Sequence, residues 1–279
     1  MIKTAIILTV HNRRDITLQG LRSLHQSIET SKKHSAFDIY MTDDECSDGT
    51  GEAVASEFPK VKIIKGNGNL YWCGGMRKAW QEAIDSGTEY DYFMWFNDDT
   101  CLYINALEEL LNASSEKKDQ CIIIGSTQNT EHTAITYGGY TKERKYVIPN
   151  GHLQLVHHFN GNIVLIPRHV YQILGNLDDY FTHSNGDIDY GLRANEAGIS
   201  SFIVGDYLGD CNRHDSLDKW CNPCVPFKER WTALHKPNGM PPKEKFYLQR
   251  KHQNIFVASF HFFTIYLRCL IPQLWKLKK

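Results

Sequence analysis

Polar and acidic side chains follow three separate apolar runs of this 279-residue sequence. The first run ends in Thr9, His11 and Asn12, the second in Asp43, Asp44, Ser47 and Asp48, and the third in Asn97, Asp98 and Asp99. If the runs are strands of one sheet, their carboxylates converge, and like charges at close range normally imply a cation. Oxygen ligands without paired Cys or His favour Mg²⁺ or Mn²⁺. Any single Asp also fits a turn or helix cap, but three strand ends together favour a site.

The elements that would position these residues alternate along the first half of the chain. Short, β-branched or aromatic apolar runs predict strands, and apolar residues at helical spacing predict helices. The expected strands cover residues 4–10, 37–41, 61–64, 92–96 and 121–125, and the expected helices cover 14–30, 51–58, 74–86 and 104–113. This alternation predicts an α/β fold with a mostly parallel sheet. Ligands of such sheets bind beyond the carboxyl ends of the strands, where the polar residues gather.

The second half of the sequence is less regular. It predicts a hairpin over 137–146, strands over 162–166 and 201–204, and helices over 168–174 and 187–197, the last closed by Gly198. Residues 205–242 are rich in Gly, Pro, Asp and Cys, which indicates a long loop region. Pro241-Pro242 marks the boundary to a basic, aromatic tail.

Charge is unevenly distributed along the chain. The 31 Lys and Arg nearly balance the 32 Asp and Glu, for a net charge of −1, so a generally basic nucleic-acid binder is not expected. Residues 243–279, however, hold eight Lys or Arg and one acid, Glu244, and carry +7, which leaves −8 on the first 242 residues. An acidic body with a basic tail indicates that the tail meets something anionic.

Residues 254–275 of the tail are strongly apolar and aromatic. As one helix they would span ~33 Å, with Asn254, His261 and Arg268 in a polar stripe. Basic residues flank the segment on both sides, which suits a helix lying in a membrane interface. The alternatives are docking on the protein's own core or in a homodimer.

The sequence also bears on cellular location and on the thiols. The apolar run Ala5–Val10 is too short for a signal-peptide core, and no uninterrupted apolar stretch is long enough for a transmembrane helix. We therefore expect a cytoplasmic protein, peripheral on the inner face of the membrane, with reduced cysteines. The pairs Cys211-x2-His214 and Cys221-x2-Cys224 have the spacing of zinc ligands; coincidence in a cysteine-rich chain is the alternative.

Two nucleotide-binding motifs are absent from the sequence. It has no Walker-type loop ending in Gly-Lys-Ser/Thr, and no G-x-G-x-x-G follows the first apolar run. The second absence disfavours a dinucleotide-dependent dehydrogenase.

Three segments resemble glycosyltransferase family 2: Thr9–Arg13 (TVHNR), Thr42–Thr50 (TDDECSDGT) and Phe96–Asp99 (FNDD). The resemblance covers residues 1 to about 205, and Gly66–Trp80 with the tail looks similar to bacterial rhamnosyltransferase-type members. It implies the GT-A fold and a nucleotide-sugar donor. It also implies three regions: a nucleotide-binding half (1–100), an acceptor-binding half (101–242) and a basic amphipathic helix (243–279).

The resemblance also implies roles for individual residues. Thr9, His11 and Asp44 would line the nucleoside pocket, Arg77 would lie near the diphosphate or base, and Asp98 and Asp99 match the end of the family's D-x-D-like motif. Asp99 would contact Mg²⁺ or Mn²⁺, with His214 as a further metal or diphosphate contact. The first position of the motif is Asn97 instead of Asp, which removes one charge.

Sugar transfer needs a general base for the acceptor hydroxyl. The segment His183–Asp189 opens an expected helix and resembles the family's acidic motif, in which Asp187 matches the base and Gly186 replaces the usual preceding acid. The alternative is that Asp187 caps the helix and Asp189 complements its dipole. Asn160 and Asp189 are the expected acceptor contacts.

The leading hypothesis is an inverting transferase that moves a hexosyl or rhamnosyl group from a UDP- or dTDP-sugar to a glycan or lipid-linked acceptor in surface polysaccharide synthesis. A nucleotidyltransferase on a related fold would ordinarily carry a Gly-rich loop after the first strand, and residues 11–15 contain no Gly. A non-catalytic sugar-nucleotide-binding module is disfavoured by the presence of Asp44, Asp99 and Asp187.

Overall fold

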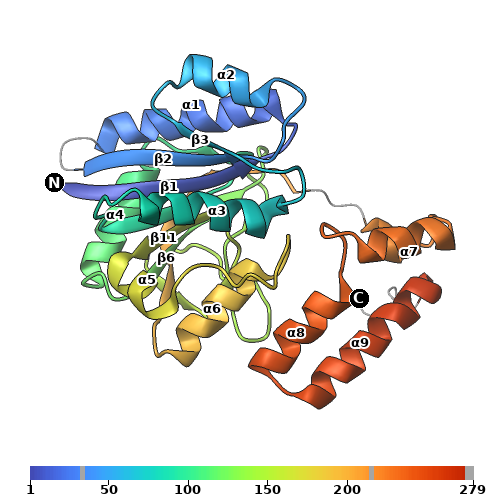
Figure 1. The fold of residues 1–279 in the computed structure, drawn as a ribbon. Coiled ribbons are helices and arrows are strands. Elements are labelled where there is room, and N and C mark those ends of the chain that lie inside the picture. The colour runs from blue at the N-terminus through green and yellow to red at the C-terminus, as the bar shows by residue number, and fades with distance from the viewer. Residues whose placement is uncertain (32–34, 214–216, 274–279) are drawn as a thin grey trace.

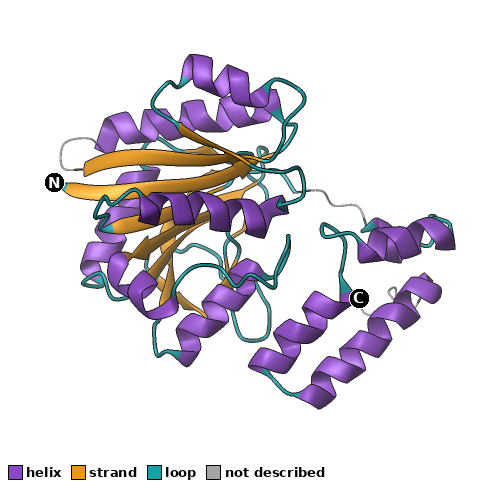
Figure 2. Ribbon diagram, in the orientation of Figure 1, coloured by secondary structure: helices purple, strands orange, loops and turns teal. Residues whose placement is uncertain are grey.

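The computed structural model describes residues 1–31, 35–213 and 217–273, and its α/β architecture is the one that the sequence predicts (Figures 1 and 2). The strands are β1 (Ile2–Val10), β2 (Ser35–Asp43), β3 (Lys62–Lys65), β4 (Tyr92–Phe96), β5 (Cys101–Leu102), β6 (Ile122–Gln128), β7 (Ile135–Tyr137), β8 (Gly139–Tyr140), β9 (Gln154–Val156), β10 (His158–Phe159), β11 (Ile163–Pro167) and β12 (Ser201–Asp210). The helices are α1 (Arg14–Ser31), α2 (Thr50–Glu57), α3 (Tyr71–Asp85), α4 (Ala106–Glu116), α5 (Arg168–Leu174), α6 (Gly186–Glu196), the short 3₁₀ helix η1 (Lys219–Cys221), α7 (Phe227–His235), α8 (Pro242–His252) and α9 (Ile255–Leu270).

The main sheet has the strand order β3-β2-β1-β4-β11-β6-β12-β5. The four strands β3, β2, β1 and β4 are parallel, so their carboxyl ends lie at one edge. Strand β11 then runs antiparallel to both β4 and β6, while β12 is parallel to β6. The sheet is therefore mostly parallel with β11 reversed in its middle, and the expected nucleotide edge is formed by β1, β2 and β4.

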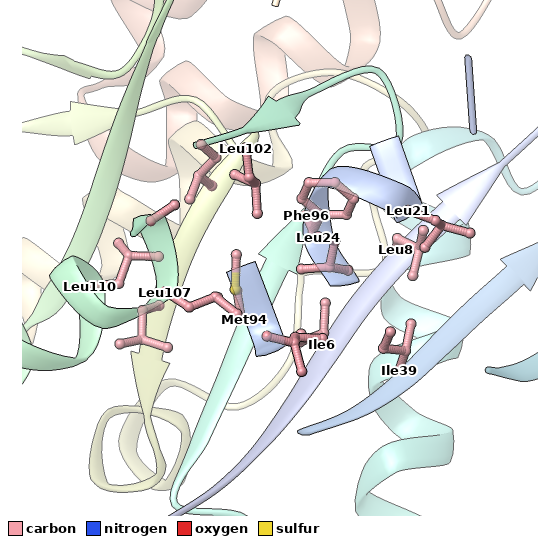
Figure 3. Packing of buried hydrophobic residues seen from close by; sticks show 14 of the residues in the cluster. Ile6, Leu8, Leu21, Leu24, Ile39, Met94, Phe96, Leu102, Leu107 and Leu110 are labelled. Carbon is pink, nitrogen blue, oxygen red and sulfur yellow. The ribbon is translucent and has the colours of Figure 1, made fainter. Parts of the chain in front are cut away.

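Two hydrophobic layers cover the sheet, because alternate residues of each central strand point to opposite faces. Along β1, Ile6 and Leu8 pack with Leu21 and Leu24 of α1, and Figure 3 shows this layer with Leu107 and Leu110 of α4. Ala5 and Ile7 point the other way, where they pack with residues of α3, α5 and α6 that include Trp80 and Tyr190. The sheet is thus the middle layer of three, and α3 and α6 both lie on its second face.

The region after residue 200 differs from the sequence-based expectation of a long loop. Strand β12 continues to Asp210, and η1 and α7 follow. Glycines inside β12 permit close backbone approach: a Cβ on Gly205 would lie 2.5 Å from the carbonyl carbon of Gly151. The expected hairpin also differs, because β7 pairs with β6, β8 pairs with β10, and the tight turn lies between Tyr140 and Tyr146.

The tail forms two helices, so the expectation of a single helix over 243–279 was wrong, and the helix expected over 254–275 is present as α9 but ends at Leu270. Helix α8 ends at His252, and Asn254 is the N-cap of α9, where its side chain accepts a hydrogen bond from the backbone N–H of Val257 at 2.9 Å. Asn254 therefore belongs to a helix start and not to a polar stripe. No helix within the described residues is long and apolar enough to cross a membrane.

Helix α8 is docked on the α/β body, α9 packs beside α8, and α7 packs on α9 (Figure 1). Leu248 of α8 is buried against Phe181 and Cys73, and Tyr247 stacks on Tyr180 with 3.9 Å between ring centroids. A second small core joins η1, α7 and α9 through Trp220, Leu234, Ile265 and Cys269. The helical part of the molecule therefore begins at Lys219, before Lys243, where the sequence placed the boundary.

Candidate active site

A cavity of about 340 Å³ opens beyond the carboxyl ends of β1 and β2. Its walls come from these strand ends, from the start of α3 and from the segment before α6. The lining residues are Thr9, Val10, His11, Arg13, Asp44, Gly68, Tyr71, Trp72, His183 and Asn238. The structure thus brings together the predicted residues Thr9, His11 and Asp44, and it adds Arg13, Tyr71, Trp72 and His183.

Asp44 organises the wall of this cavity through its carboxylate. One oxygen accepts backbone hydrogen bonds from Asn67 (3.2 Å) and Gly68 (2.8 Å), and the other accepts from Leu70 (2.9 Å) and Tyr71 (3.1 Å). The side chain is 3% exposed. Since four donors occupy the four acceptor directions of a carboxylate, a contact from a base N–H to Asp44 has to compete with this turn.

His11 and Thr9 line the cavity beside Asp44. The carbonyl oxygen of Asp44 only accepts, so Nδ1 of His11, 2.7 Å away, carries the proton and donates to it. In the neutral ring Nε2 is then an acceptor, and the Asn12 amide donates to it at 3.2 Å. Thr9 lies under α3 at a close crossing, because a Cβ on Gly75 would lie 2.0 Å from the Thr9 hydroxyl oxygen.

The cluster of acids at the strand ends is neutralised mainly by side chains of the chain itself. Asp43 accepts from Lys65 at 2.6 Å, and Asp48 accepts from the backbone N–H groups of Arg14 and Thr50, each at 3.0 Å. These two acids have the turn and capping roles weighed from the sequence. Charge convergence alone therefore does not require a cation at this edge of the sheet.

Arg13 binds the two remaining acids together. Its guanidinium pairs with Asp98 and, at 2.9 Å, with Asp99, while the Thr17 hydroxyl donates to Asp98 at 2.6 Å. Asp98 is 1% exposed, and burial raises the pKa of its carboxyl to about 6 in spite of Arg13. Asp98 therefore holds Arg13 from below and does not line the cavity, which differs from its expected contact with the nucleotide.

Asp99 is the member of the acidic motif that faces outward, with 34% of its side chain exposed. One oxygen accepts from Arg13, and for the other the described residues provide only the Cys211 thiol, at 3.7 Å. Among the described residues, no three His, Cys, Asp or Glu side chains form a group that could hold a metal ion. Mg²⁺ in phosphate-binding sites is commonly held by one or two carboxylates plus substrate phosphates, and the free oxygen of Asp99 fits that kind of site.

His214 lies outside the described residues, so its predicted metal contact stays a prediction. The cysteines that could bind zinc together with His214 have different surroundings from one another. Cys211 lies beside Asp99 at the end of β12, and burial raises the pKa of its thiol to about 12. Cys221 instead packs with Trp220 and Cys269 in the helical region.

Asp187 lies in the first turn of α6 and does not line the cavity. Its two oxygens accept from the backbone N–H groups of Gly161 (3.0 Å) and Ile188 (2.8 Å). Asn185, and not Asp187, is the N-cap of α6. Burial raises the pKa of the Asp187 carboxyl above its ordinary value, which suits a group that must accept a proton.

Trp72 connects the cavity to Asp187. It lines the cavity, and a Cβ on Gly161 would lie 2.5 Å from the edge of its six-membered ring and 3.4 Å from the Asp187 Cβ. Close packing also explains why position 186 is a glycine. A Cβ on Gly186 would lie 2.5 Å from the Cys73 sulfur, so Cys73 occupies the room that an acid at position 186 would need.

Two predicted site residues have other positions. Asp189 is 0% exposed and accepts from Arg193 (2.8 Å), Lys251 (2.7 Å) and His252 (2.8 Å). It joins α6 to α8 and cannot touch an acceptor. Arg77 directs its guanidinium to the carbonyl oxygen of Asp178 at 3.2 Å, and it does not line the cavity. Asn160, in contrast, lines a second cavity next to Asp187.

Arg13 and Trp72 stand inside longer motifs of the sequence, and no role was predicted for either residue. Arg13 follows the first strand directly, as anion-binding residues at this edge often do, and that position was an available signal. His183 belongs to the segment His183–Asp189, in which the sequence predicts the base. No pattern along the chain, however, indicates that the side chain of Trp72 would span from α3 to Asp187.

Several solved structures have a similar fold. A crystal structure of S. aureus TarS 1–349 in complex with UDP-GlcNAc has a TM-score of 0.60 and 11% identity, and the match covers 98% of this chain and 72% of that one. The UDP complex of the same protein gives 0.54 and 12%, with coverages of 75% and 59%. GalNAc-T7 with UDP, GalNAc and Mn²⁺ gives 0.58 and 12%, with coverages of 77% and 44%. The fold is that of the GT-A glycosyltransferases, as predicted.

The sequence profile of glycosyl transferase family 2 matches residues 5–169, more than half of the chain. A search of curated proteins finds no match. The chain belongs to glycosyl transferase family 2. The matched region contains the cavity residues of β1, β2 and α3 and the acidic motif after β4, and it ends before Asp187.

Proposed function

We propose that the chain is an inverting glycosyltransferase that moves a hexosyl or rhamnosyl group from a UDP- or dTDP-sugar to a glycan or lipid-linked acceptor in surface polysaccharide synthesis. The observation that carries the proposal is that Trp72 lines the strand-end cavity while its ring edge and the Asp187 Cβ both lie close to Gly161. A nucleoside diphosphate placed in that cavity directs its sugar toward this side chain. The nucleotide-bound TarS and GalNAc-T7 structures are consistent with such a donor.

Each part of the cavity has a chemical task in this reaction. Thr9, His11 and the turn held by Asp44 receive the nucleoside. Arg13, fixed by Asp98, faces the diphosphate and offsets the charge that the leaving group gains. A divalent cation bound by Asp99 and the diphosphate oxygens would supply further stabilisation of that charge.

Asp187 acts on the acceptor. As the acceptor oxygen attacks the anomeric carbon, its proton passes to the Asp187 carboxylate, the bond from the anomeric carbon to the phosphate oxygen breaks, and the nucleoside diphosphate leaves with the electron pair. The backbone N–H groups of Gly161 and Ile188 fix the orientation of that carboxylate. Attack opposite the leaving group inverts the configuration at the anomeric carbon.

We also propose that α9 rests on an anionic membrane surface at the cytoplasmic face. Its outer side carries Phe256, Phe260, Phe263 and Leu270, which recur at helical spacing and are all exposed, Phe256 to 83%. Its inner side packs on the protein through Ala258, Ile265 and Cys269. The +7 charge of residues 243–279 is complementary to such a surface.

The function is tested by titrating UDP, dTDP, GDP and ADP into the full chain with and without Mn²⁺, and by measuring nucleotide release from the corresponding sugars. We expect UDP or dTDP to bind in a metal-dependent way and its sugar to be consumed. Asp99→Ala should lose the metal-dependent part, and the matched variant Asp179→Ala, at an exposed acid outside the cavity, should retain it. Binding of none of the four nucleotides contradicts the proposal.

A further inference from the structure

A second cavity, of about 550 Å³, is lined by Asn160 and by Ile188, the residue that follows Asp187. Helix α6 forms one wall, α8 another, and the turn between Tyr140 and Tyr146 a third. Asn160, at its edge, directly precedes Gly161, whose backbone N–H binds Asp187. An acceptor bound in this cavity therefore reaches the proposed base through its nearest hydroxyl group.

Cations dominate the charged groups of this cavity. Lys142 and Arg144 extend from the turn, and Lys245 extends from α8. None of the three forms an ion pair with a carboxylate in the part of the chain that the structure describes, and Lys245 has a single long hydrogen bond, 3.4 Å, to the Asn185 side chain. The acid in the lining, Glu196, is already bound to His252 at 2.6 Å.

Burial and the neighbouring positive charges lower the pKa of two groups in this cavity, His158 and Lys245. Burial, together with His157, Arg144 and Lys245, lowers the pKa of His158 to about 4, so that its ring is neutral. Burial and Arg144 also lower the pKa of Lys245 to about 8, although Asp187 acts in the opposite direction. The cavity thus holds cations that repel one another in the free protein, and an anion would relieve this repulsion.

A buried polar group also lacks a partner here. Gln249 of α8 lines the cavity and is 2% exposed, yet its side-chain oxygen has no hydrogen-bond partner in the structure. Buried polar atoms are nearly always satisfied by protein, water or ligand. A carboxamide can present either its oxygen or its NH₂ group to a ligand, so Gln249 provides a further polar contact besides the three cations.

We propose that this cavity binds a phosphate group of the acceptor substrate, held by Lys142, Arg144 and Lys245 while a hydroxyl of the same molecule lies at Asp187. The proposal rests on the proposed function and specifies its acceptor class. Three unpaired cations match a phosphoryl group with its charge and several acceptor oxygens better than they match a neutral sugar. The phosphate belongs either to a phosphodiester-linked polymer or to the diphosphate of a lipid carrier.

The test measures anion binding with the donor cavity already filled. Glycerol 3-phosphate is titrated calorimetrically into the full chain saturated with UDP and Mg²⁺. We expect binding in the wild type and a loss of roughly tenfold or more in Lys142→Gln/Arg144→Gln and in Lys245→Gln, since each removes charge-assisted hydrogen bonds. Lys145→Gln, on the same turn but outside the cavity lining, is the matched control and should bind as the wild type does.

UDP affinity and thermal melting, measured on every variant, show whether each is folded and whether the donor cavity is intact. If UDP binds but glycerol 3-phosphate does not, or if all variants bind it equally, the acceptor proposal is wrong and the proposed function survives. Failure of UDP, dTDP, GDP and ADP all to bind overturns the proposed function instead. Glycerophosphoglycerol and geranyl diphosphate, tested in the same way, distinguish a polymer phosphodiester from a lipid diphosphate, and tight binding of either supports the cavity's role.

Discussion

The indole N–H of Trp72 donates a hydrogen bond to the side-chain oxygen of Asn97, with 2.7 Å between the two atoms. Asn97 occupies the first position of the acidic motif, where the family resemblance expects Asp. The structure gives this position a different task, because the amide holds the ring of Trp72, which lines the strand-end cavity. A carboxylate would add a third negative charge to the pair that Arg13 already neutralises.

The metal proposal predicts different effects for two neighbouring acids. Asp99→Ala should remove Mn²⁺-dependent binding of UDP or dTDP with little loss of stability, since Asp99 is partly exposed. Asp98→Ala should lower the free energy of unfolding by about 1–3 kcal/mol, because Thr17 and Arg13 lose a buried partner. Calorimetry and urea unfolding measure the two effects. Unchanged Mn²⁺-dependent binding in Asp99→Ala would remove Asp99 from the metal site.

The base proposal predicts that Asp187→Asn retains donor binding and loses roughly 10²–10⁴-fold in kcat. The amide keeps the size of the side chain and one acceptor oxygen for Gly161 or Ile188. Because burial raises the pKa of Asp187 and the base acts when deprotonated, wild-type kcat should rise with pH through a value above that of an ordinary carboxyl. Asp187→Asn should lack this rise of kcat with pH, whereas Asp179→Asn should keep it. Near-normal turnover in Asp187→Asn is the contrary result.

The ion cluster around Asp189 predicts a pH dependence of stability. Although burial opposes both shifts, hydrogen bonds between Asp189 and His252 lower the pKa of Asp189 and raise that of His252, with Lys251 and Glu196 contributing. The contribution of His252 is therefore full below its unfolded pKa of about 6.5 and is lost as pH rises through its raised folded pKa. The contribution of Asp189 is present above about pH 3.9 and is lost as pH falls through its lowered folded pKa.

Urea unfolding of the wild type and His252→Gln across this range measures the effect. Their difference in free energy should be largest near pH 6 and should shrink toward alkaline pH. Asp189→Asn should cost about 3–5 kcal/mol near neutral pH, since it leaves buried cations without a partner. A difference between the wild type and His252→Gln that is independent of pH would contradict the assignment.

The membrane proposal predicts the behaviour of the outer face of α9. The triple variant Phe256→Glu/Phe260→Glu/Phe263→Glu should lose binding to phosphatidylglycerol vesicles in a flotation assay. Ile104→Glu, at a body position that is 63% exposed, is the matched control and should float with the vesicles. Raised salt should weaken wild-type binding, because near-surface basic residues contribute about 1 kcal/mol each. Equal flotation of the triple variant and the wild type would rule out this face.

Local pattern predicted the α/β part of the fold well, because its signals are carried by short segments. The run Tyr92–Phe96 is apolar at every position, which a strand buried on both faces requires, and the structure has β4 at these residues. Asp44 also lines the strand-end cavity, since the carboxyl ends of parallel strands share an edge. These inferences needed no knowledge of long-range contacts.

The errors arose where distant contacts override local composition. Gly205 suggested a loop, but in β12 it allows close approach of the backbone at Gly151. Asn254 fits a seven-residue polar spacing, yet it is the N-cap of α9 and follows a break after α8, where one continuous tail helix was expected. Asp189 has the local environment of an acceptor contact, and only the docking of α8, more than fifty residues later, provides Lys251 and His252.

Helix α8 is fastened to the body at both ends, by Glu244 to Thr182 at its start and by His252 to Asp189 at its end. Helix α9 begins three residues after α8 ends. If Asp187 is the base, α8 links it to the aromatic side of α9 and sets the distance between them. When α9 rests on a surface, an acceptor hydroxyl reaches Asp187 only if it lies at the same height above that surface as Asp187 does. The length of the acceptor then becomes a criterion for selection alongside its chemistry.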